Sequence, residues 1–170
     1  MTLSPSVTAI HPAQGAVQAS QDCGRARLAL CYPTPTCVLI AVTGEIDATN
    51  RQLFGGFVES HIRKSHQLIL DLSEVAFFGS QGFTALYYVS AHCARRDVDW
   101  ALIGNRGVRR IVGICDPDGA LPLADDQTAA LARLEHLARR AKPVYRRSAT
   151  VSPWPRRVTF SRAAIRRGIG

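Results

Sequence analysis

The segment that most constrains this chain is residues 67–86, which read QLILDLSEVAFFGSQGFTAL. A short apolar run is followed by a second apolar step that ends at Phe78, and residues 79–82 then open a stretch with apolar residues at helical spacing. A buried strand therefore passes directly into a helix, and Ser80 lies at the junction. Because the first turn of a helix carries unpaired N–H groups and the positive end of the dipole, a hydroxyl there is exposed and close to an anion-binding position. We interpret Ser80 as a candidate switch residue.

Strand and helix patterns alternate along the rest of the chain. Such alternation implies right-handed crossovers and a largely parallel sheet, and the turn at 33–36 joins the first two strands into an antiparallel edge hairpin. We predict an α/β fold with a mostly parallel sheet of four or five strands and about four helices. Strands are expected at 25–32, 37–43, 68–72, 99–103 and 121–123, and helices at 47–64, 82–95, 108–114 and from Asp125 or Asp126 onwards.

The helix expected at 47–64 has one apolar face and two consecutive glycines near its middle. Either Asp47 or Thr49 can cap it. Gly55-Gly56 interrupts it, at a cost of about 1 kcal/mol for each glycine relative to alanine, and close helix–sheet contact is the interpretation we prefer. The residues expected to share its inner face are Leu53, Phe57 and either Phe54 or Ile62. In the next helix, the expected inner residues are Leu86, Val89 and Cys93.

The two ends differ from the central part of the chain. Residues 1–22 are rich in Ser, Thr, Pro, Ala and Gln and are predicted to be disordered, because they bury too little apolar surface to offset the entropy of ordering. We assign 25–138 to one folded domain and 142–170 to a basic tail that is also predicted to be disordered.

The net charge of +8 belongs mainly to the tail. Residues 139–170 hold ten basic and no acidic residues, whereas the first 138 hold 11 basic and 13 acidic ones. The body is therefore not expected to bind nucleic acid. For the tail two hypotheses remain: sequence-independent contact with nucleic acid, or a solvated segment with no specific role, which we favour.

The sequence offers little for catalysis or for a metal. The five cysteines form no CxxC pair and the five histidines have no ligand spacing, while the P-loop, GxGxxG and GxSxG motifs are absent. We therefore expect no enzymatic activity and no cofactor. A reducing compartment suits unpaired cysteines, no signal peptide pattern is present, and no apolar run approaches the roughly 18 residues of a membrane helix, so a cytoplasmic location is expected.

Two carboxylates follow a buried strand in Gly44-Glu45-Ile46-Asp47. Capping of the next helix accounts for Asp47. Glu45 is less easily explained by structure, because an acidic residue that leaves a central strand usually faces a partner or a cation.

Several short motifs in a fixed order give this chain a family resemblance. These motifs are Gly44-Glu45-Ile46-Asp47, then, about thirty residues on, Asp71-Leu72-Ser73 and 77–82, then the strand at 100–103 and the helix from Val108. With them the chain resembles, over residues 25–138, a STAS domain, the fold of the anti-sigma factor antagonists of bacterial stress and sporulation control.

The resemblance implies a binding module that docks on an anti-sigma factor and so regulates sigma-factor-dependent transcription. In that family the loop usually reads Asp-Ser-Ser/Thr-Gly, and a cognate serine kinase phosphorylates the serine after the Asp. Ser80 has that place and Gly82 is retained, whereas Gly79 and Gln81 replace the acid and the second hydroxyl residue. The expected partner-binding residues are Glu45, Asp47, Gly79, Ser80, Gln81 and Gly82.

Two other readings stay open at this stage. Ser80 can be a plain helix N-cap, worth about 1 kcal/mol. Alternatively, the chain is a ligand-sensing or scaffold STAS module that holds a nucleotide or another anion at the same helix N-terminus.

Overall fold

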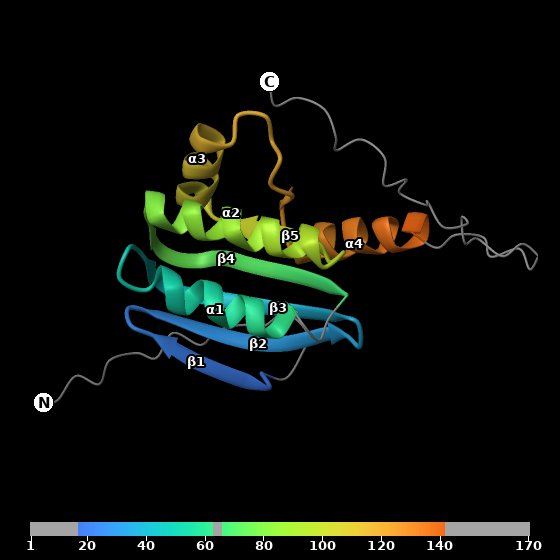
Figure 1. Cartoon of the computed structure of the whole chain (residues 1–170), viewed down its shortest axis with the longest axis horizontal. Coiled ribbons are helices and arrows are strands. Elements are labelled where there is room, and N and C mark those ends of the chain that lie inside the picture. Colours follow the sequence, from blue (N-terminus) through green and yellow to red (C-terminus); the bar gives the residue numbers. More distant parts are fainter. Residues whose placement is uncertain (1–16, 63–65, 142–170) are drawn as a thin grey trace, which may run out of the picture.

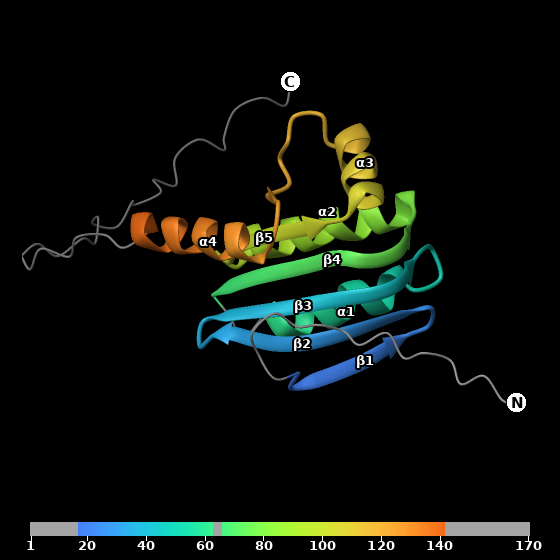
Figure 2. The same cartoon turned by 180° about the vertical axis from the view of Figure 1, so that it is seen from behind.

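The computed structural model describes residues 17–62 and 66–141, which form one sheet of six strands and four helices (Figures 1 and 2). The strands lie in the order of the sequence across the sheet. They are β1 (Ala19–Cys23), β2 (Ala26–Thr34), β3 (Cys37–Ile46), β4 (Gln67–Phe78), β5 (Asp99–Gly104) and β6 (Leu123–Ala124). The helices are α1 (Arg51–Ile62), α2 (Ser80–Arg95), α3 (Arg106–Cys115) and α4 (Gln127–Ala141).

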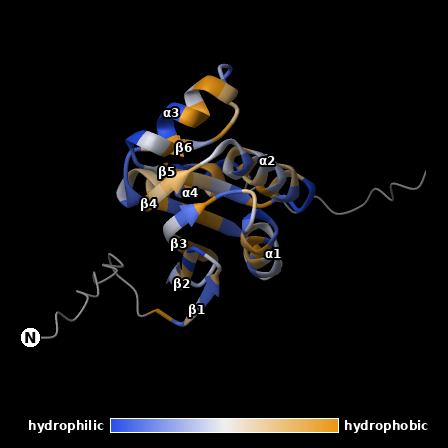
Figure 3. Ribbon diagram, turned by 90° about the vertical axis from the view of Figure 1, so that its left-hand side faces the viewer, coloured by the Kyte–Doolittle hydropathy of each residue, from blue (hydrophilic) through white to orange (hydrophobic). Residues whose placement is uncertain are grey.

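The sheet has an antiparallel half and a parallel half. The pairs β1–β2 and β2–β3 are antiparallel, and β3–β4, β4–β5 and β5–β6 are parallel. Helices α1 and α2 cover one face and α4 covers the other, while α3 lies beside the start of α2 (Figure 3). The predicted α/β architecture is therefore confirmed.

The sheet gains one strand over the prediction because β1 begins within residues 1–22, which were predicted to be disordered. That prediction is wrong for residues 19–22, which form β1 together with Cys23. Four of its five residues are exposed, and backbone pairing with β2 holds the strand, so its side chains carry no apolar signal. Residues 1–16 and the basic tail at 142–170 lie outside the described residues.

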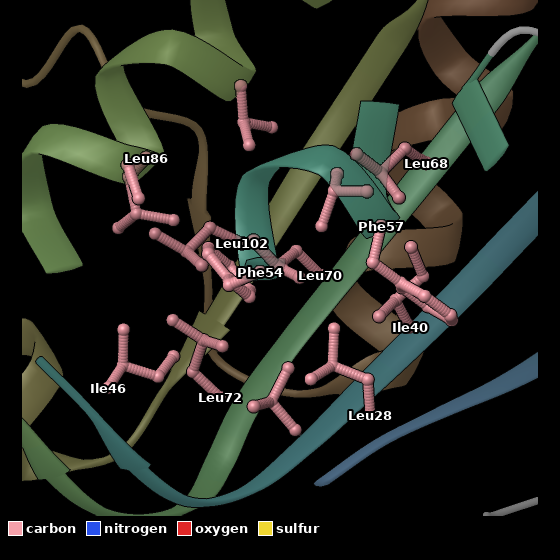
Figure 4. Close-up of a cluster of buried hydrophobic side chains, with 14 of the residues drawn as sticks. Leu28, Ile40, Ile46, Phe54, Phe57, Leu68, Leu70, Leu72, Leu86 and Leu102 are labelled. Atoms are coloured by element: carbon pink, nitrogen blue, oxygen red, sulfur yellow. The ribbon is translucent and has the colours of Figure 1, made fainter. Parts of the chain in front are cut away.

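The larger core cluster lies between the sheet and the helices α1 and α2. Phe54 of α1 and Leu86 of α2 meet side chains from four neighbouring strands (Figure 4). The strand residues drawn there include Leu28, Ile40, Leu70 and Leu102. As predicted, Leu86, Val89 and Cys93 are buried.

Helix α1 begins later than predicted, at Arg51, and the face that it buries differs from the predicted one. Its buried residues are Phe54, Phe57, Val58 and Ile62. Leu53 is 52% exposed, so its predicted inward position is wrong. Two overlapping apolar faces fit the helical period of this segment, and only the position of the sheet selects between them.

The two glycines of α1 do not pack closely, which contradicts the predicted helix–sheet contact. A Cβ atom added at Gly55 or Gly56 would have nothing within 4 Å. In α2 the situation is reversed, because a Cβ atom at the buried Gly82 would lie 2.6 Å from the ring of Phe78. Close packing therefore accounts for Gly82 and leaves Gly55 and Gly56 unexplained.

None of the helices within the described residues is long and apolar enough to cross a membrane.

Candidate functional site

Parallel pairing of β3 with β4 brings the two predicted parts of the site to one edge of the sheet. Glu45 is the register partner of Phe77, and Ile46 is the partner of Phe78. Directly beyond them, the N–H of Gly79 donates to the carbonyl of Ile46 at 3.1 Å. The residues that follow the strands, Asp47 and Ser80, therefore leave the sheet side by side. We call this surface the docking edge; it comprises Glu45, Asp47, Phe77, Gly79, Ser80 and Gln81.

Ser80 does not cap its helix. The N-cap position is Gly79, without a side-chain cap, and Ser80 is the first residue of α2. The side chain of Ser80 is exposed, and its hydroxyl has no hydrogen-bond partner among the described residues. The capping interpretation of Ser80 is therefore wrong, and its hydroxyl is exposed at the first turn of α2.

The residues next to Ser80 differ in how far they are exposed on the surface. Gln81 is half-buried, and Gly79 lies beside the ring of Phe77. Gly82 is buried beneath the ring of Phe78 and contributes packing rather than surface.

Glu45 is anchored within the protein by the turn between β1 and β2. Its carboxylate pairs with the guanidinium of Arg25 at 3.0 Å, and its N–H donates to the carbonyl of Arg25, also at 3.0 Å. The preceding Gly44 has a φ of +87°, and a Cβ atom there would lie 2.2 Å from that same carbonyl oxygen. Glycine is therefore required for this close approach, which a sequence pattern does not reveal.

Asp47 organises the turn before α1. Its Oδ1 accepts from the N–H of Thr49 at 2.8 Å and from the hydroxyl of Thr49 at 2.6 Å. These hydrogen bonds hold the pKa of the Asp47 carboxyl below its usual range, since they stabilise the ionised form. Asp47 therefore presents a stable negative charge at the docking edge.

Asn50 joins the two turns beneath this edge, and sequence reasoning missed it. It is 1% exposed, and its side-chain amide donates to the carbonyls of Cys23 at 3.1 Å and Glu45 at 2.7 Å. Its Oδ1 accepts from the N–H of Asp47 at 3.0 Å. Because all these partners are backbone groups, no residue pattern signals the role in advance.

A groove of about 530 Å³ continues the edge between the end of β4 and α3. Phe77 is 54% exposed and Ile114 is 67% exposed, and both line it. Arg106 and Arg110 line it as well and are exposed, with no ion pair to any described residue. We call it the α3 groove. The sequence analysis did not predict this groove. The apolar residues of α3, a helix whose charged residues are all basic, are the sequence feature that could have indicated it.

The α3 groove is fixed to the sheet by Asn105. This residue caps α3, accepting from the N–H of Val108, and its amide donates to the carbonyls of Ser73 at 3.2 Å and Val75 at 2.7 Å. The described residues contain no group of side chains that could hold a metal ion. An apolar surface with charged residues around it suits the docking of another protein.

Comparison with known proteins adds a family and a fold. Residues 31–116 match the model of the STAS domain. A curated relative, Osmosensory protein A of Mycobacterium tuberculosis, is 29% identical over 99 residues, which cover 58% of this chain and 62% of the relative. The aligned region thus spans less than two thirds of that relative's length.

Two solved structures are similar to this one. An anti-sigma factor antagonist from Mycobacterium paratuberculosis has a TM-score of 0.57 at 20% identity, covering 65% of this chain and 94% of that one. The unphosphorylated form of the anti-sigma factor antagonist SpoIIAA has a TM-score of 0.54 at 16% identity, covering 64% of this chain and 96% of that one. At these identities the likeness is one of fold.

Proposed function

Because the chain belongs to the STAS domain family, we propose that it is an anti-sigma factor antagonist, a binding module without catalytic activity of its own. The observation that carries the proposal is Ser80, an exposed and unbonded hydroxyl at the first turn of α2, beside the acidic end of β3. Proteins of the same fold that are described as anti-sigma factor antagonists support this assignment.

The docking edge and the α3 groove together form the proposed partner surface. Exposed Phe77 and Ile114 supply apolar contact, and such apolar centres carry most of the affinity of protein interfaces. Arg106 and Arg110 complement acidic side chains of the anti-sigma factor, while Glu45 and Asp47 complement basic ones. Opposite charges on neighbouring parts of one surface fix the orientation of the partner and speed association.

Phosphorylation of Ser80 by a serine kinase is the proposed off signal. A phosphate adds a charge of about −1.5 to −2 and three acceptor oxygens. The N-terminus of α2 tolerates this anion, so the fold is retained. A partner that fits a neutral hydroxyl beside Asp47 then meets added negative charge and bulk. SpoIIAA, which shares this fold, is described in an unphosphorylated and in a phosphorylated form, which supports the idea that the fold accommodates such a switch.

The test begins with capture of an anti-sigma factor by the full chain from a lysate of its own cells. The affinity of the captured protein is then measured for the wild type, Ser80→Ala and Ser80→Asp. Ser80→Ala should bind like the wild type, and Ser80→Asp should bind more than about a hundredfold more weakly, a loss of about 3 kcal/mol. Mass spectrometry of the protein from its own cells should find phosphate on Ser80.

Two matched controls accompany these variants. Thr128 is an exposed hydroxyl residue in the first turn of α4, on the other face of the sheet, and Thr128→Asp should leave affinity unchanged. Phe77→Ala should lower affinity about tenfold or more, whereas Leu53→Ala, at a similarly exposed apolar residue on α1, should not. Equal affinity for all Ser80 variants, with no phosphate found, would refute the switch; capture of no anti-sigma factor would refute the partner.

A further inference from the structure

Gly55 lies in the middle of α1 and has no packing role. Nothing lies within 4 Å of a Cβ atom added there, although a glycine inside a helix costs about 1 kcal/mol relative to alanine. Gly55 instead lines a groove of about 340 Å³ between α1 and α2. A side chain at this position would project into that groove, so glycine keeps it open.

The groove has apolar walls from both helices. Ile62 and Val89 are buried at its base, and the ring of Tyr88, 62% exposed, stands at its rim. Its volume falls in the lower part of the range of about 300–1,000 Å³ that small-molecule sites occupy. No residue of the docking edge lines it. The full lining is Arg51, Gln52, Gly55, Glu59, Ile62, Ala85, Tyr88, Val89 and His92.

Arg51 is the one charged residue of the groove lining that has no ion pair to another described residue. His92 and Glu59 pair with each other, with 2.7 Å between Nε2 and Oε1, and Arg95 hydrogen-bonds to the other ring nitrogen of His92. Arg51 lines the same groove and has no ion pair to any residue in the described ranges. An occupant of matching chemistry therefore combines an apolar body with one anionic group.

We propose that the groove between α1 and α2 binds a small amphipathic organic anion, whose apolar body lies between the two helices and whose anionic group pairs with Arg51. This site is independent of Ser80 and goes beyond the proposed docking function. It also explains why Gly55 is tolerated where alanine would give a more stable helix.

The test uses the full chain and 1-anilinonaphthalene-8-sulfonate, an aromatic body with one sulfonate. Its fluorescence should report saturable binding at one site per chain. Gly55→Leu should fill the groove and weaken binding about tenfold or more, equivalent to about 1.4 kcal/mol. Gly56→Leu is the matched control, because Gly56 has equally open surroundings on the same helix but does not line the groove, and it should bind like the wild type.

A second pair of variants keeps the test independent of changes in α1. Tyr88→Ala should weaken binding, whereas Tyr87→Ala should not, since Tyr87 is 64% exposed and lies outside the lining. The neutral analogue N-phenyl-1-naphthylamine tests the role of charge. Arg51→Gln should weaken binding of the sulfonate and leave binding of the neutral analogue unchanged.

Three outcomes would overturn the proposal. The first is unchanged sulfonate affinity in both Gly55→Leu and Tyr88→Ala, and the second is equal loss in the control variants Gly56→Leu and Tyr87→Ala. The third is a wild-type dimer in sedimentation that Gly55→Leu converts to monomer, because a second copy of the chain would then be the occupant. Ser80→Asp should bind the sulfonate like the wild type, so failure of the proposed switch is distinguishable from failure of this site.

Discussion

At the scale of single residues, one substitution has opposite effects at two glycines. Gly82→Ala should lower the free energy of unfolding by about 1–3 kcal/mol, because the new methyl group would lie 2.6 Å from the buried ring of Phe78. Gly56→Ala should raise it by about 0.5–1 kcal/mol, because nothing surrounds the new methyl group and alanine favours the helix. Urea denaturation of both variants measures their free energies of unfolding. If both substitutions changed this free energy in the same direction, the packing around the two glycines would be contradicted.

At the scale of elements, the start of α4 depends on one of two adjacent acids. Oδ1 of Asp126 accepts from the N–H of Ala129 at 2.7 Å, which is an N-cap bond. Asp126→Ala should therefore cost about 1 kcal/mol of stability. The carboxylate of Asp125 is 91% exposed and pairs with Arg109 at 3.3 Å, so Asp125→Ala should cost only a few tenths of a kcal/mol. Equal urea midpoints for the two variants would show that Asp126 does not cap α4.

At the scale of the whole molecule, the five cysteines report on global unfolding. All are free thiols; four are buried, and Cys115 is exposed. Burial raises the pKa of the thiols of Cys37 and Cys93 to about 12, so almost no reactive thiolate forms there at pH 8. Ellman's reagent should titrate one thiol at once in the native protein and all five in urea. Rapid reaction of two or more native thiols would contradict this core.

The alternation of strands and helices, and most of the residues that face inward, could be predicted from the pattern of side chains along the chain. Period and hydropathy are local properties, so Leu86, Val89 and Cys93 were correctly predicted to be buried in α2. The same local signal predicted that a strand passes into a helix near Ser80 and that Glu45 lies at the end of another strand. The resemblance to the STAS fold placed these two segments close together, and the parallel pairing of β3 with β4 accounts for it.

Which groups contact one another depends on the folded arrangement of the strands and helices. The strand β1 is held by backbone pairing rather than by apolar side chains, and the amide of Asn50 binds carbonyls of two distant turns. Leu53 is exposed because the sheet lies against the other of two possible faces of α1. The contacts of β1 and of Asn50 join residues far apart in the sequence through backbone N–H and C=O groups, which do not depend on residue type. A pattern of side-chain types therefore predicts that a residue is buried or exposed, but not which partner it meets.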